Sequence, residues 1–161
     1  MRRRVRRPIR PRRTRSSVRL ALEVVNRYET SMLPTTVRGL AFLDRVAHEI
    51  VWLHLDMFHM SLEEAAPFDV LKQALPRLAY FELDQSHRGA IVDGSLDLIE
   101  WAKETCSAGY AGTVGVEVFS RALMTLEHAN ALAIWEDRFT EGEKIAAEFM
   151  RVIDADFADR G

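Results

Sequence analysis

Four short apolar runs, each followed by a stretch with helical spacing, are the feature that most constrains the fold of this chain. The runs cover residues 20–25, 50–56, 78–84 and 113–119. Helical spacing follows at residues 36–46, 62–75 and 95–107, and then at 127–158 with an interruption near 140–142. The runs recur at roughly the 30 residues of a strand–helix–strand unit. The order predicts an α/β fold with a parallel sheet, buried on both faces, and helices outside it.

Local signals refine this pattern. Thr35 or Thr36 is a suitable N-cap for the first helix. Pro67 is expected to loosen the second helix, and Gly109 to stop the third. No glycine-rich phosphate-binding fingerprint follows any of the strands, which disfavours a dinucleotide-binding fold.

An acid lies at or near the carboxyl end of each predicted strand: Glu23, Asp56, Glu82 and Glu117. A carboxylate in an apolar strand is costly unless it is paired or bound to a cation. In a (β/α)8 barrel the carboxyl ends of the strands converge on one mouth, where active sites lie. Four carboxylates there would repel one another without a cation, and oxygen ligands suit Mg²⁺ or Mn²⁺.

Further polar side chains follow the same strands. Glu29, His59 and Arg88 come shortly after the first, second and third strand, where they are placed to hold hydroxyl groups by hydrogen bonds. His54 precedes Asp56 by two residues and should point inward one layer lower. We interpret His54 as a satisfied interior polar group rather than a ligand.

Charge is distributed unevenly along the chain. Residues 1–22 contain ten arginines and no acid, which leaves 12 basic residues against 24 acids in the remainder. Residues 1–17 lack periodicity and are predicted to form a disordered basic tail. The tail has no aromatic for base stacking and no apolar stretch of a signal peptide, so neither nucleic-acid binding nor secretion is expected.

Two further observations bear on the environment of the protein. No apolar run reaches the roughly 18 residues that a membrane helix needs. The single cysteine, Cys106, excludes an internal disulfide. We therefore expect a cytoplasmic protein without membrane contact.

Four ordered motifs together resemble the D-tagatose/D-psicose 3-epimerase group of the xylose-isomerase-like TIM barrels. They are residues 23–30 (EVVNRYET), 55–64 (LDMFHMSLEE), 86–89 (SHRG) and 109–119 (GYAGTVGVEVF), and residues 133–137 (AIWED) are also similar to that family. The resemblance implies a sugar or sugar phosphate isomerase or epimerase with a divalent metal, Mn²⁺ or Mg²⁺. Its partner is then a small sugar.

The resemblance also implies roles for individual residues. Glu23, Asp56 and Glu117 match metal ligands, and Glu23 and Glu117 also match the two acid/base groups on opposite faces of the substrate. One removes a proton beside the ketose carbonyl and the other returns a proton from the other side of the resulting enediolate. A further set, Glu29, His59 and Arg88, matches positions that contact sugar hydroxyls.

This chain departs from the family pattern in two ways. Glu82 stands where the family usually has a histidine ligand, so the metal set becomes Glu23, Asp56, Glu82 and Glu117. The match also begins at the fifth strand, so residues 18–161 are expected to form the C-terminal half of a TIM barrel, four βα units equivalent to strands five to eight. A misassigned start, a truncated relic and a homodimer of half-barrels each explain the short chain.

Two other functions stay open at this stage. One is a metal-dependent phosphodiesterase related to apurinic-site endonucleases, which would require a histidine-rich cluster. The other is a non-catalytic barrel fragment, which would be inactive alone and prone to aggregate through its strand edges.

Overall fold

The computed structural model describes residues 18–157, although side chains are described only to residue 154. The basic tail predicted to be disordered, residues 1–17, lies outside the described residues. In the part of the chain that the structure describes, no helix is long and apolar enough to cross a bilayer.

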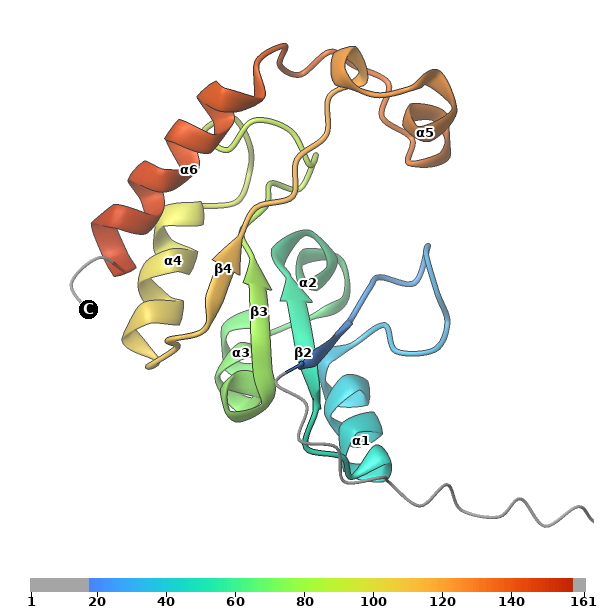
Figure 1. The fold of residues 1–161 in the computed structure, drawn as a ribbon, viewed down its shortest axis with the longest axis vertical. Coiled ribbons are helices and arrows are strands. Elements are labelled where there is room, and N and C mark those ends of the chain that lie inside the picture. The colour runs from blue at the N-terminus through green and yellow to red at the C-terminus, as the bar shows by residue number, and fades with distance from the viewer. Residues whose placement is uncertain (1–17, 158–161) are drawn as a thin grey trace, which may run out of the picture.

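A parallel sheet of four strands forms the centre of the molecule (Figure 1). Its order along the sheet is β1 (Leu20–Glu23), β2 (Val51–Asp56), β3 (Leu78–Glu82) and β4 (Thr113–Gly115). Every neighbouring pair is parallel, as the sequence pattern predicted. The register pairs Glu23 with His54 and Asp56 with Glu82, so polar residues of adjacent strands lie side by side.

Helices follow each strand. They are α1 (Thr36–Val46), α2 (Met57–Glu63), α3 (Pro67–Ala74), α4 (Leu98–Ser107), α5 (Leu126–Ala131) and α6 (Gly142–Phe157), with short 3-10 turns at Leu75–Arg77 and Arg121–Leu123. The Thr35 side chain accepts a hydrogen bond from the backbone N–H of Arg38 and caps α1, as predicted. Gly109 ends the α4 segment with a φ of 90°, a conformation that glycine adopts without steric cost.

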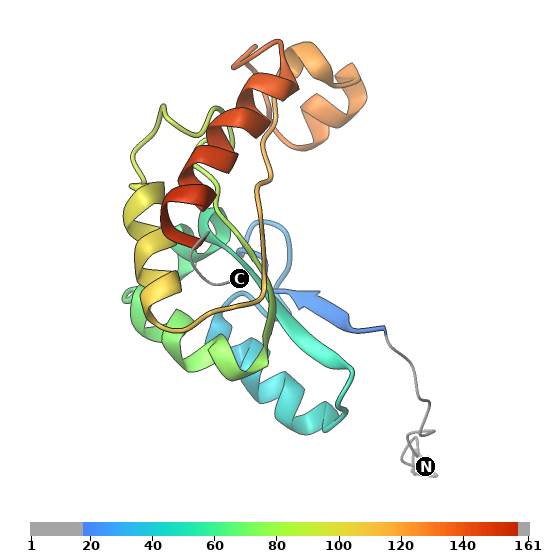
Figure 2. The same ribbon diagram turned by 60° about the vertical axis from the view of Figure 1, so that its left-hand side comes forward.

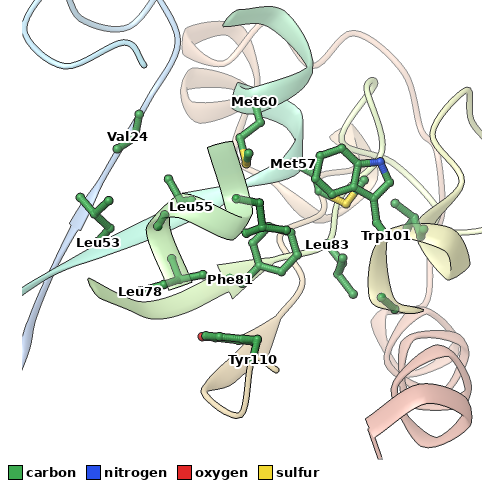
Figure 3. Close-up of a cluster of buried hydrophobic side chains, with 14 of the residues drawn as sticks. Val24, Leu53, Leu55, Met57, Met60, Leu78, Phe81, Leu83, Trp101 and Tyr110 are labelled. Atoms are coloured by element: carbon green, nitrogen blue, oxygen red, sulfur yellow. The ribbon is translucent and has the colours of Figure 1, made fainter. Parts of the chain in front are cut away.

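The hydrophobic core lies between one face of the sheet and the helices. α1 packs against α3, α3 against α4 and α4 against α6, and these helices lie along one side of the sheet (Figure 2). The side chains of Leu53 and Leu55 in β2, and of Phe81 in β3 and Leu83 directly after it, occupy alternate positions and are 0% exposed. Figure 3 shows Phe81 and Leu83 in this cluster beside Trp101 of α4. Because strand side chains alternate, the residues between them face the other side of the sheet.

Two helices differ from their predicted bounds because of backbone chemistry. The single helix expected at 62–75 is two helices, and Pro67 begins the second instead of loosening the first. Proline has no N–H and a fixed φ, both of which suit the first position of a helix. Asp56 caps α2, which therefore begins directly after β2. The C-terminal helical region is split by residues 132–141, a wider gap than predicted, which includes Ala133 at a φ of 55°.

The fourth strand is shorter than the predicted run of 113–119. Beyond Gly115 the backbone N–H of Glu117 donates to the Asp84 side chain at 3.4 Å, and that of Phe119 donates to the Arg88 carbonyl at 2.6 Å. The loop after β3 therefore takes over the hydrogen bonds that a longer strand would make. These bonds position Glu117 next to the end of β3.

Candidate active site

The predicted site residues gather on the sheet face opposite the core. Glu23, Asp56, Glu82 and Glu117 alternate with apolar residues that lie in the core or pack against it, and so share this face. In a closed barrel this face is the interior. The four acids are not equivalent, because they fall into groups with different partners.

His59 connects Glu23 with Asp56. Its Nδ1 accepts the backbone N–H of Asn26 at 3.2 Å and also lies 2.8 Å from the Asn26 amide nitrogen. The ring proton is therefore on Nε2, which lies 3.5 Å from Glu23 Oε1 and 3.7 Å from Asp56 Oδ2. The hydrogen bond from His59 lowers the pKa of the Glu23 carboxyl, although partial burial opposes this shift. Glu23 is thus held in its ionised form.

A second group brings together Asp56, Glu117 and Asp84, a residue that the sequence analysis did not include in the site. One oxygen of each of the three lies within 4.8 Å of the others. Burial raises the pKa of Asp56, although His59 and Arg88 oppose the shift. Burial and the nearby charge of Asp56 raise the pKa of Asp84 to about 10. The sequence signal for Asp84 is its spacing of two from Glu82, which puts both on one face of an extended segment.

Arg88 faces this acidic group. Its guanidinium contacts Glu117 and lies 3.7 Å from Asp56 Oδ2 and 3.7 Å from Glu29 Oε1. The charge stacks between the rings of Phe58 and Phe119, at 4.7 and 4.8 Å. Arg88 has a φ of 52°, an uncommon backbone conformation for a residue with a side chain. Two aromatic rings and three acids therefore hold the Arg88 guanidinium in place at the carboxyl end of the sheet.

Glu82 lies with a different partner. Its Oε2 accepts a hydrogen bond of 2.8 Å from Nε2 of His54, whose Nδ1 is 3.9 Å from Glu23. His54 therefore has the polar partner expected of an interior histidine. Glu82 belongs to a group with Glu23 and His54, and its register partner on β4 is Gly115, two residues before Glu117.

The three residues predicted to contact sugar hydroxyls lie close together. Glu29 is 43% exposed and lies 3.8 Å from His59 Nδ1 and 3.7 Å from Arg88 Nη1. Of the three, Arg88 also lines a cleft of about 340 Å³, together with Phe58 and Trp135. Trp135 belongs to the AIWED segment, which lies between α5 and α6. Donors, acceptors and an aromatic ring thus border a space of the size of a small ligand.

The donor atoms fit a hard divalent cation. Asp56 Oδ2 and Asp84 Oδ2 are buried oxygens without a hydrogen-bond partner among the described residues. The three groups of side chains that could hold a metal offer mainly carboxylate oxygens, with at most one histidine in each. Oxygen ligands of this kind suit Mg²⁺ or Mn²⁺. Within residues 18–157 these groups are not the histidine-rich cluster that the phosphodiesterase alternative requires.

Known proteins match this chain in both sequence and fold. An L-ribulose 3-epimerase of Methylomonas sp. (strain DH-1) is 33% identical over 136 residues, 84% of this chain and 48% of the relative. A ketose 3-epimerase of Arthrobacter globiformis is 34% identical, over 81% of this chain and 45% of its own length. A crystal structure of the D-allulose 3-epimerase from Methylomonas sp. in complex with D-allulose superimposes with a TM-score of 0.79 at 32% identity, over 86% of this chain and 48% of that one.

The similarity to the epimerase group inferred from four motifs is thus confirmed. The chain spans about half the length of the curated relatives that it matches. A family model described as a xylose isomerase-like TIM barrel matches residues 3–153. The chain therefore belongs to the xylose isomerase-like TIM barrel family.

Proposed function

We propose that this chain provides the C-terminal half, strands five to eight, of a sugar or sugar phosphate isomerase/epimerase that inverts the carbon next to a ketose carbonyl. The observation that carries the proposal is the approach of Glu23 and Glu117, from the ends of the first and last strands, to Asp56 between them. The epimerase relatives support the substrate class, since their names describe ketoses.

Two carboxylates are needed because one base on one face of the substrate could only reverse its own proton transfer. Glu23 is ionised and therefore able to accept a proton, since the hydrogen bond from His59 lowers its pKa. Glu117 follows β4, at the other edge of the sheet from Glu23, and its contact with Arg88 orients its carboxylate. Each glutamate acts from its own face, one taking the proton and the other returning one.

The remaining residues hold the sugar and the cofactor. Glu29, His59 and Arg88 bind hydroxyl groups of the sugar, and Arg88 does so at the wall of the cleft. Glu23, Asp56, Glu82 and Glu117 contribute the oxygens that would hold a divalent metal, Mn²⁺ or Mg²⁺. When bound, such a metal polarises the carbonyl and stabilises the enediolate. Arg88 is buried between two rings, so water only weakly screens the charge through which it would bind a sugar oxygen.

Solvent-proton exchange tests this proposal with any ketose that the site accepts. L-ribulose and D-psicose are incubated in D2O with Mn²⁺ and either the full chain or a chimera that adds the first half of the Methylomonas relative. NMR then measures deuterium at the carbon next to the carbonyl, while light scattering records whether the chain alone forms a homodimer. Exchange is expected in the chimera, and in the chain alone if two half-barrels pair.

The control variants make this test specific. Glu23→Gln and Glu117→Gln should each abolish epimerisation in the chimera, because each removes one of the two proton-transfer groups. Asp44→Asn alters an exposed carboxylate on α1 and should leave the rate unchanged. A folded, metal-binding chimera that exchanges no proton with either ketose would refute the proposed function and favour a non-catalytic fragment.

A further inference from the structure

Asp84 occupies a position in the acidic group that the roles assigned above do not explain. It lies two residues beyond the end of β3, and its side chain is 0% exposed. Its Oδ1 accepts the backbone N–H of Glu117 at 3.4 Å, so Asp84 and Glu117 are linked directly. Its Oδ2 has no hydrogen-bond partner among the described residues. A buried carboxylate oxygen without a partner is expensive, which indicates that something binds there.

Asp56 repeats this arrangement on the neighbouring strand. It is also 0% exposed, and its Oδ1 caps α2 through the His59 backbone N–H at 3.3 Å. Its Oδ2 likewise makes no hydrogen bond among the described residues, although it lies 3.7 Å from His59 Nε2 and from Arg88 Nη2. Each aspartate therefore uses one oxygen to fix the backbone and leaves the other available. Oxygens of Asp56, Asp84 and Glu117 converge within 4.8 Å. Three such oxygens, from the ends of three successive strands, form a rigid facial set for a hard cation.

Glu82 is not a member of this set of three oxygens. Its Oε2 is engaged by His54 at 2.8 Å, and its group shares only Glu23 with the other acids of the site. The carboxylate following β3 that lies next to Asp56 and Glu117 is that of Asp84, two residues further along the extended segment. The inner end of the site thus ties Glu82 to a histidine, while the outer end presents Asp84.

We propose that Asp84 is a direct ligand of the divalent metal in this site, together with Asp56 and Glu117. The assignment rests on the proposed function only for the presence of the metal. The convergence of the three carboxylate oxygens is observed independently of that function. It places the metal toward the outer end of the strands, beside Arg88, which also lines the cleft. A substrate that enters from the cleft would meet the metal before it reaches His54.

Mn²⁺ binding to the full chain, measured by calorimetry and by the EPR signal of free Mn²⁺, tests this assignment without any catalytic readout. Asp84→Asn keeps the shape of the side chain and should weaken binding by about tenfold or more, since loss of an outer partner alone has that effect. Asp44→Asn, the same chemical change at an exposed ion pair, should bind like the unaltered chain. Melting with a chelator present establishes that each variant is folded.

A ligand swap separates direct coordination from a mere effect of charge. Asp84→Cys should bind Cd²⁺ with a thiolate–metal absorption band in the ultraviolet, because soft thiolates select soft metals. The unaltered chain, whose single cysteine is the buried Cys106, is the control and should show no such band. This readout also covers the case in which Asp84→Asn does not fold.

The outcomes distinguish the two proposals. Unchanged Mn²⁺ affinity in folded Asp84→Asn, or no Cd²⁺ band in Asp84→Cys, overturns the assignment of Asp84 and leaves the epimerase proposal intact. Weakened binding in Asp84→Asn with no proton exchange in the chimera supports the metal ligand and refutes the epimerase. An unaltered chain that binds no Mn²⁺ overturns the metal site, and Asp84 with it.

Discussion

The imidazole of His54 and the carboxylate of Glu82 form a 2.8 Å hydrogen bond between β2 and β3, with side chains only 13% and 10% exposed. The bond explains how a buried acid is accommodated at the end of β3. A neighbouring histidine on the next strand donates to it, so the buried charge has a partner. Burial of either group alone would be costly.

Loss of the Glu82 acceptor should therefore destabilise the chain. Glu82→Leu leaves the His54 donor buried without a partner, which costs about 1–3 kcal/mol. Glu82→Gln retains an acceptor oxygen and should cost less. Urea unfolding with a chelator present measures both variants. Equal stability of the two would mean that the hydrogen bond contributes little.

His59 should control the ionisation of Glu23. The hydrogen bond from His59 is the main cause of the lowered pKa of Glu23, so His59→Leu should raise that pKa above its present value. A ¹³C NMR titration of the glutamate carboxyl carbons measures the change. His48→Leu, on the loop between α1 and β2, should leave the Glu23 titration unaltered. An unchanged pKa in His59→Leu would contradict this arrangement.

The stability of the metal-free chain should fall as pH rises. Burial and Asp56 raise the pKa of Asp84 to about 10 from an ordinary value of 3.8. Between these values the folded chain keeps a proton that the unfolded chain has lost, so each step up in pH favours unfolding. The limiting slope for one group is about 1.4 kcal/mol per pH unit.

The Asp84→Asn variant provides the comparison. Because it carries no titratable group at this position, its stability should depend less on pH than that of the unaltered chain. Urea unfolding from about pH 6 to about pH 9, with a chelator present, measures the difference. Parallel pH profiles for the two proteins would show that Asp84 ionises freely in the folded state.

Gly115 should tolerate no side chain. The Tyr80 hydroxyl lies over Gly115, where the Cβ of an alanine would overlap it. Gly115→Ala must displace the Tyr80 ring, at a cost of about 1–3 kcal/mol. Gly142→Ala, at the start of α6, meets nothing within 4 Å and should be neutral or stabilising. Equal urea midpoints for the two variants would argue against close contact of Tyr80 with β4.

Most of the fold was predictable from local pattern. The four apolar runs coincide with the four parallel strands, and Thr35 caps α1 at the predicted boundary. These features depend on side-chain alternation and capping chemistry, which neighbouring residues alone determine. The early end of β4 and the full width of the gap at residues 132–141 were not predictable, because they depend on hydrogen bonds to distant segments.

The sequence by itself determined which acids end the strands, and with them the family and the candidate roles of Glu23 and Glu117. Only the tertiary structure decided how those acids are grouped. Asp84 is near Glu82 in the sequence but joins Asp56 and Glu117, whereas Glu82 is bound to His54. Strand register alone does not give this grouping, since it pairs Asp56 with Glu82. The grouping comes from side-chain contacts between segments about 30 residues apart. Burial then gives each carboxyl its own pKa, and no local pattern encodes burial.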